Sequence, residues 1–127
     1  MIKIAFSGSR KRSARLQIRN IILGYINKYG IENIVIVHGG CPKGIDAEVK
    51  EIAEELGVKQ VIFYPEKQEA RYYLERNKKI ARYADILYAF PGSRETGEKA
   101  LKGIVTRGGT EHTIRQFVKL GKPVILY

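Results

Sequence analysis

Small and hydroxyl-bearing residues gather directly after the apolar runs of this 127-residue chain, and at the start of its last predicted helix. Glycine lets backbone N–H groups approach an anion closely, and a helix N-terminus adds unpaired N–H donors with a partial positive charge. Such turns therefore predict a site for a phosphate group. The turns concerned are Ser7-Gly8-Ser9-Arg10, His38-Gly39-Gly40-Cys41, Pro91-Gly92-Ser93 and Arg107-Gly108-Gly109-Thr110.

Two kinds of side chain in these turns suit the same ligand. Ser7, Ser9 and Thr110 add hydroxyl donors. Arg10 and Arg107 add positive charge and fork-shaped hydrogen bonding. One such turn alone is weak evidence for a ligand, because glycine commonly follows a strand in ordinary turns. All of them at one edge of a sheet would predict a nucleotide-like ligand.

The elements that must position these turns alternate along the chain. Apolar and β-branched runs predict strands at 2–6, 34–37, 60–64, 86–90 and 124–127. Apolar residues at helical spacing predict helices at 13–29, 44–56, 68–84 and 110–120. Such alternation produces right-handed crossovers and a parallel sheet. The predicted fold is therefore α/β: a three-layer, Rossmann-like open parallel sheet of about five strands with helices on both faces.

This fold predicts where the turns meet, because ligands of open parallel sheets bind outside the carboxyl ends of the strands. We expect residues 1–127 to form a single domain with an insertion at about 93–107. The segment between the fourth strand and the last helix, 92–109, is longer than usual for such a loop. Part of it, near Glu95 to Ile104, could form an extra helix. It is either a functional lid or a solvated insertion.

The charge balance favours polyanionic or phosphorylated partners. There are 23 Lys and Arg against 13 Asp and Glu, a net charge of +10. Residues 1–31 hold seven of the basic side chains and no acidic one. Such a surplus steers anions toward a protein, so nucleic acid is an alternative partner. No recognisable nucleic-acid motif accompanies the charge.

Several classes of site are excluded or disfavoured. The single cysteine, Cys41, excludes a disulfide within one chain and a multi-cysteine zinc site. Two histidines and one cysteine make no convincing metal site, so we expect no metal and no cofactor apart from a nucleotide-like ligand. The G-x-G-x-x-G and G-x-x-x-x-G-K-[ST] fingerprints are missing, which disfavours an NAD dehydrogenase or a P-loop NTPase.

The same sequence predicts a cytoplasmic protein without a membrane partner. No apolar run approaches the roughly 20 residues of a membrane span. The N-terminus moves directly into a strand-like run and lacks the features of a signal peptide. One cysteine in the whole chain suits a reducing compartment.

The ordered motifs resemble the SLOG superfamily. This Rossmann-like group holds the DprA/Smf DNA-processing proteins, the molybdenum cofactor carrier proteins and the Lonely Guy phosphoribohydrolases. The resemblance covers nearly the whole chain and is closest to small stand-alone members. The motifs are Gly8-Ser9-Arg10, His38-Gly39-Gly40 with Gly44 and Asp46, Pro65, Arg76-Asn77, Ala84-Asp85, Ala89-Phe90-Pro91-Gly92 and Gly109-Thr110.

The resemblance implies a pocket for a nucleotide or nucleotide derivative. The residues implied are Gly8, Ser9, Arg10, Gly39, Gly40, Asp46, Arg76, Asn77, Gly109 and Thr110. The phosphate argument from the turns adds Gly92 and Gly108. Related small Rossmann-like domains often pair, so a homodimer is one option.

Two departures from the enzymes of this group bear on catalysis. The Lonely Guy enzymes carry P-G-G-x-G-T-x-x-E and an Arg-Lys pair, where this chain has Thr113 and Asn77. Cleaving an N-glycosidic bond needs a carboxylate or its equivalent, and Asp46 and Glu111 are the weak candidates. The leading hypothesis is therefore nucleotide binding as a sensor or carrier. The alternatives are a Lonely Guy-like nucleoside monophosphate phosphoribohydrolase and DprA-like binding of single-stranded nucleic acid.

Overall fold

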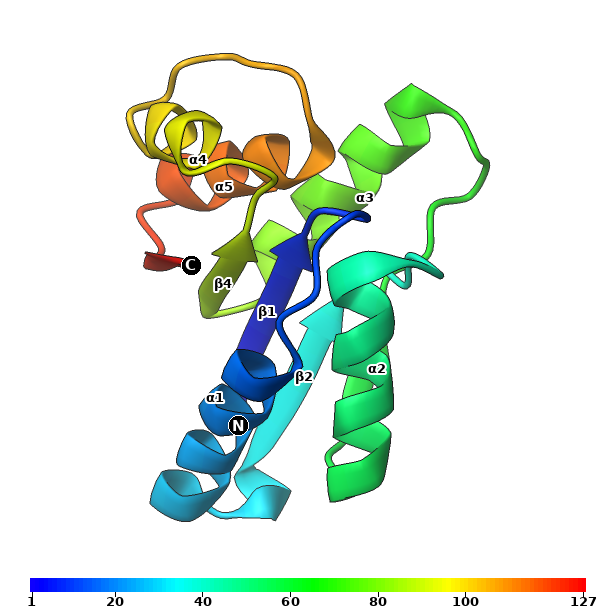
Figure 1. The fold of residues 1–127 in the computed structure, drawn as a ribbon, viewed down its shortest axis with the longest axis vertical. Helices are drawn as coiled ribbons and strands as arrows, with labels where there is room; N and C mark the ends of the chain where they lie inside the picture. The colour runs from blue at the N-terminus through cyan, green and yellow to red at the C-terminus, as the bar shows by residue number, and fades with distance from the viewer.

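The five strands of this protein form one parallel sheet, which confirms the predicted α/β class. The computed structural model describes residues 1–127 (Figure 1). The strand order is β3-β2-β1-β4-β5, and every neighbouring pair is parallel. The strands are β1 (Ile2–Gly8), β2 (Ile34–His38), β3 (Gln60–Ile62), β4 (Ile86–Phe90) and β5 (Val124–Leu126).

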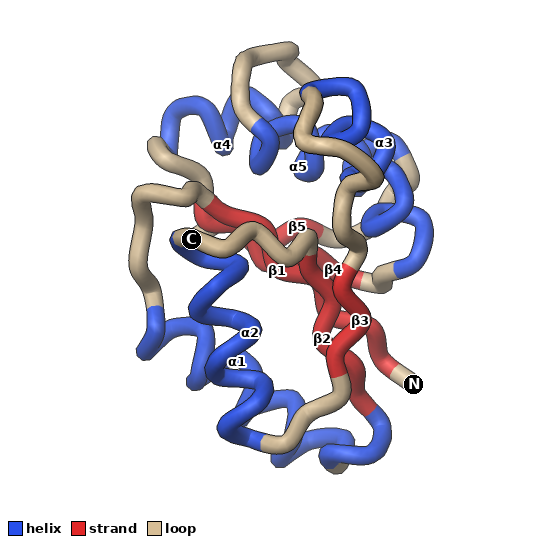
Figure 2. The backbone as a smooth tube through the Cα atoms, turned by 90° about the vertical axis from the view of Figure 1, so that its right-hand side faces the viewer, coloured by secondary structure: helices blue, strands red, loops and turns tan.

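Helices cover both faces of the sheet. They are α1 (Arg15–Tyr29), α2 (Gly44–Leu56), α3 (Ala70–Tyr83), α4 (Arg94–Leu101) and α5 (Gly109–Lys119), with one 3₁₀ turn at Ile31–Asn33. Figure 2 shows α1 and α2 on one face and α3, α4 and α5 on the other. Each face has its own apolar core, one built around Phe6 and Ile18 and the other around Leu87 and Phe117. The result is the three-layer arrangement expected of alternating strands and helices.

The helices can cover both faces of the sheet because its central strands are apolar on both sides. All five residues of β2 are buried, as an uninterrupted β-branched run predicts for a strand covered on both faces. The helix expected inside the 93–107 insertion is present as α4. The remaining 102–108 segment has no regular structure and leads directly into α5 (orange in Figure 1).

The strand order creates a switch point beside β1. From β1 the chain moves outward to β2 and β3 on one side, and it returns to the other side for β4 and β5. The connections after neighbouring strands therefore leave in opposite directions at the carboxyl ends of β1 and β4. Open α/β sheets hold their ligands at such a point. None of the helices combines the length and apolarity needed to cross a bilayer.

Candidate functional site

A cleft of about 740 Å³ opens at this switch point, between the carboxyl ends of β1 and β4 and the helices α3 and α5. Ten of the twelve residues predicted to bind a ligand line it, together with the carboxylate candidate Glu111. The ten are Gly8, Ser9, Arg10, Asp46, Arg76, Asn77, Gly92, Gly108, Gly109 and Thr110. Segments more than a hundred residues apart in the sequence thus contribute to one surface.

The other two predicted residues, Gly39 and Gly40, lie outside the lining of the cleft. The carbonyl oxygen of Gly39 accepts a hydrogen bond from Arg76 Nη1 at 2.5 Å. A Cβ atom at Gly39 would overlap that guanidinium, and one at Gly40 would overlap the Tyr64 ring. Both glycines therefore allow neighbouring side chains to pack closely against this turn.

The N-terminus of α5 presents free hydrogen-bond donors to the cleft. The backbone N–H of His112 donates to Gly108 O at 3.1 Å, so the N–H groups of Gly109, Thr110 and Glu111 precede the first helical bond. Gly108 occupies the N-cap position of α5 and has no side chain that could accept hydrogen bonds from these N–H groups. Thr110 is 7% exposed and its hydroxyl has no partner within the chain. These donors suit an anion.

Four arginines line the cleft, and none of them is paired with a carboxylate. They are Arg10, Arg76, Arg107 and Arg115. The seven ion pairs of the chain involve only residues outside the cleft. Arginines on the outer surface, such as Arg15 and Arg94, do have glutamate partners. The four arginines therefore outnumber Asp46 and Glu111, the two carboxyl groups of the lining, and form no ion pair with either of them.

Arg76 and Asn77 connect α3 to the rest of the site. Arg76 donates to the carbonyl oxygens of Gly39 and Phe63 and, through Nε, to Asn77 Oδ1 at 2.9 Å. Burial lowers the pKa of the Arg76 guanidinium. Asn77 is 4% exposed and donates from Nδ2 to Gly109 O at 3.3 Å. The Asn77 amide therefore positions the first residue of α5.

His112 is held as a neutral imidazole at the wall of the cleft. Asn77 Nδ2 lies 3.3 Å from His112 Nδ1, and Gln116 Nε2 lies 3.2 Å from His112 Nε2, so amide groups contact both ring nitrogens. Burial, together with the charges of Arg115, Lys78 and Lys119, lowers the pKa of His112 to about 4. A neutral side chain here adds no charge to the site near pH 7.

This low pKa predicts a pH-dependent stability. Between about pH 4 and 6.5 the unfolded chain binds more protons at His112 than the folded chain, so the free energy of unfolding falls as the pH falls through this window. We expect His112→Asn, which can still accept from Asn77, to reduce the change in melting temperature between pH 7 and pH 4.5. Part of the change will remain, because burial also lowers the pKa of His38. Equal pH profiles for the variant and the parent would contradict the assignment.

The two carboxyl groups in the lining are both hydrogen-bonded by the protein. Asp46, 8% exposed, accepts from the backbone N–H of Cys41 at 3.2 Å, and burial raises its pKa. Glu111, 7% exposed, accepts from the Thr96 hydroxyl at 2.7 Å. The Glu111 bond attaches α4, and with it the insertion, to the first turn of α5.

The cleft also contains residues that the turn patterns did not indicate. Arg115 lies three residues after His112, a spacing that places both on one face of α5. Tyr73 stands between two arginines, with its ring centroid 5.7 Å from Arg10 Cζ and 5.6 Å from Arg76 Cζ. Helical spacing was the available signal for Arg115. For Tyr73 the sequence favoured a core position over stacking on a base.

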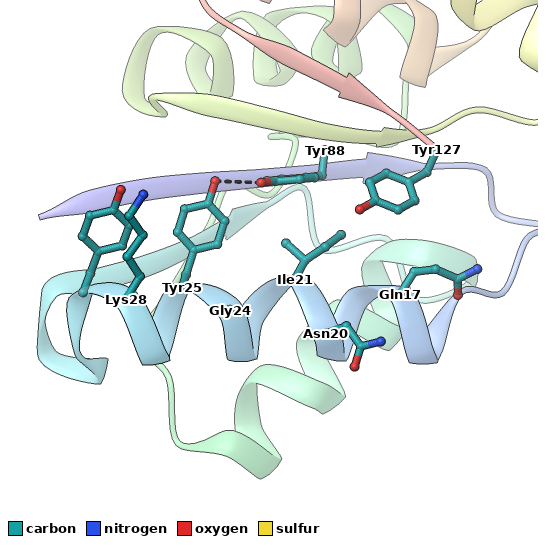
Figure 3. A pocket seen from close by; sticks show the side chains of 9 residues that line it. Gln17, Asn20, Ile21, Gly24, Tyr25, Lys28, Tyr88 and Tyr127 are labelled. Atoms are coloured by element: carbon teal, nitrogen blue, oxygen red, sulfur yellow. Dashed lines mark hydrogen bonds between the residues drawn. The ribbon is translucent and has the colours of Figure 1, made fainter.

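A second cavity, of about 560 Å³, lies against α1 on the opposite face of the sheet (Figure 3). Tyrosines dominate its wall, and the hydroxyls of Tyr25 and Tyr88 are 2.7 Å apart. Lys28 is the one charged side chain among its nine lining residues. Because the α5 cleft has four arginines and free backbone donors, it is the stronger candidate for a functional site.

No family model, curated protein or solved structure matches this chain. The resemblance to the SLOG superfamily therefore stays a prediction from the motifs. Nowhere in the chain do three or more His, Cys, Asp or Glu side chains come together in a way that could hold a metal ion.

Proposed function

We propose that this chain binds a phosphorylated nucleotide or nucleotide derivative in the α5 cleft, as a sensor or carrier of that ligand. The observation that carries the proposal is the set of four cleft arginines without a carboxylate partner. Arg76 and Arg115 are half-buried, and partly desolvated charges are costly unless they are paired. A phosphate ester supplies the missing negative charge and accepts hydrogen bonds from guanidinium forks.

The phosphate of this ligand would sit at the N-terminus of α5. The free N–H groups of Gly109 and Thr110 and the unpartnered Thr110 hydroxyl supply the donors. Ser9, across the cleft, already accepts from the backbone N–H of Lys11 and keeps its hydroxyl proton available to donate. Helix N-termini with small residues are a common way to bind phosphate.

The nucleoside part would lie against α3. Ala70, Tyr73 and Leu74 form the least polar part of the cleft wall. The faces of aromatic rings stack on bases without selecting strongly among them. The guanidinium of Arg10 already lies over the Tyr73 ring, so a base stacked on this ring would lie close to Arg10.

Binding is favoured over catalysis by the state of the carboxyl groups. Glycosidic cleavage needs a carboxyl group that can serve as acid, base or nucleophile toward the sugar. Glu111 is bonded to Thr96 and Asp46 to the Cys41 backbone, so each carboxyl has a structural partner. A binding role requires nothing of these two groups beyond the contacts that they already make.

The test is the effect of nucleotides on melting temperature, measured for the parent and for Arg10→Ala. A ligand that binds only the folded state stabilises it by about 2.7 kcal/mol at one hundred times its dissociation constant. We expect nucleoside phosphates to raise the melting temperature of the parent. Because Arg10 lines the cleft and has no carboxylate partner, we expect Arg10→Ala to weaken binding by roughly 10–100-fold, the effect of one charge-assisted hydrogen bond.

Arg82→Ala is the matched control. Arg82 is exposed on α3, makes no ion pair and lies outside the cleft, so its loss removes the same charge without altering the proposed site. We expect this variant to respond to nucleotides as the parent does. The proposal would be overturned if adenosine, guanosine, cytidine and uridine phosphates all left the melting temperature of the parent unchanged.

A further inference from the structure

We infer that the cleft has a second phosphoryl subsite, formed by Arg107 and Arg115, and therefore prefers nucleoside diphosphates to monophosphates. This inference rests on the proposed function and specifies its ligand. Both arginines line the cleft beside the phosphate position at the start of α5. Arg107 belongs to the insertion and Arg115 to α5, whereas Ala70, Tyr73 and Leu74 of the lining belong to α3.

Neither of these two arginine side chains forms an ion pair or a strong hydrogen bond within the protein. Arg107 is exposed and has no side-chain hydrogen bond or ion pair. Arg115 is half-buried, and its one side-chain hydrogen bond is a long one of 3.5 Å to the carbonyl oxygen of Thr106. A guanidinium has five N–H donors, and only one of those of Arg115 has found an acceptor. Most of its hydrogen-bonding capacity is therefore free for a ligand.

A third observation lies on the same wall. The hydroxyl oxygen of Thr106 is the one buried side-chain polar atom of the chain that lacks a hydrogen-bond partner. Such an atom costs free energy until it finds a partner. Thr106 belongs to the 102–108 segment and lines the cleft one residue before Arg107. This unsatisfied atom therefore lies next to Arg107 of the proposed second subsite.

The size of the cleft and its number of hydrogen-bond donors also exceed what one phosphate requires. A phosphate monoester carries about −1.5 to −2 at neutral pH, and the donors of α5 with Arg10 are enough to hold it. Arg107 and Arg115 then remain available to a second phosphoryl group, since neither forms an ion pair with the carboxyl groups of the lining, Asp46 and Glu111. The volume of about 740 Å³ lies in the upper part of the range of roughly 300–1,000 Å³ for small-molecule sites.

The experiment is calorimetric titration of the full chain with two pairs of ligands, without added divalent cations. The first pair is AMP and ADP, repeated with GMP and GDP because the base is not specified. The second pair is inorganic phosphate and pyrophosphate, which tests the two subsites without a nucleoside. We expect the diphosphate member of each pair to bind at least about tenfold more tightly, the effect of one added charge-assisted contact.

Two variants locate the effect. We expect Arg115→Gln and Arg107→Gln to weaken ADP binding by about tenfold and AMP binding by much less, so that the ratio of the two constants approaches one. Arg107 is exposed, so its variant tests the subsite even if Arg115→Gln impairs folding. Arg82→Gln removes an equal charge outside the cleft and should keep the ratio of the parent.

The outcomes separate this inference from the proposed function. Equal affinities for mono- and diphosphates in the parent would overturn the second subsite and leave nucleotide binding standing. A preference for diphosphates that persists in both arginine variants would also overturn it, because the second phosphoryl group would then bind elsewhere. If no nucleotide of either kind bound, the proposed function would fail together with the inference.

Discussion

Replacing Gly109 by aspartate is expected to abolish nucleotide binding without destabilising the protein. Gly109 is the first residue of α5, its φ is not in the left-handed region, and a Cβ atom there would meet nothing within 4 Å. The new side chain therefore fits. A carboxylate in the first turn of a helix contributes about 0.3–1 kcal/mol of favourable interaction with the helix dipole.

The same carboxylate would stand where the phosphate is proposed to bind. Two like charges about 4 Å apart repel by roughly 4 kcal/mol at the effective dielectric constant of a protein surface, which corresponds to a loss of affinity of more than about 100-fold. Titration calorimetry of the variant measures this loss, and thermal melting checks that the fold is retained.

Gly109→Asn is the control for this substitution. Asparagine has nearly the same shape as aspartate and no charge, so it separates repulsion from steric blocking. We expect the asparagine variant to bind nucleotides far more tightly than the aspartate variant. Equal affinities of the two variants would indicate that the phosphate does not bind at the N-terminus of α5.

The second large effect is expected at Gly44, where the chain enters α2. Gly44 has φ +68°, a conformation that L side chains rarely adopt. A Cβ atom here would overlap the carbonyl oxygen of Ser9, a residue that lines the cleft. Backbone cannot move aside as a flexible side chain can. We expect Gly44→Ala to cost roughly 2–5 kcal/mol, the left-handed strain plus overpacking.

Gly57 supplies a matched comparison at the other end of the same helix. Its φ is +72°, almost equal to that of Gly44, but a Cβ atom there would meet nothing within 4 Å. Gly57→Ala should therefore show only the conformational cost of about 1–2 kcal/mol. Denaturant unfolding of both variants measures the difference. Equal losses of unfolding free energy in the two variants would mean that the Ser9 backbone can move away from a Cβ atom at position 44 without a cost in stability.

The fold followed from local patterns because those patterns depend only on neighbouring residues. The buried run of β2 and the helical stripe of α5 were visible in the sequence, and the structure has both elements there. Parallel strands bring their carboxyl ends to one edge. The convergence of Ser9, Gly92 and Gly109 in one cleft was therefore predictable once the alternation of strands and helices was recognised.

The sequence by itself determined the α/β class and the set of turns that surround the cleft, whereas the tertiary structure decided how individual side chains are used. Asn77 bonds Gly109, Glu111 bonds Thr96, and Arg115 turns toward the cleft. Helical spacing shows which residues share a face. It does not show which other helix that face meets. Partners in α3, α4 and α5 are chosen by how these helices pack on the sheet, and that packing depends on the whole chain.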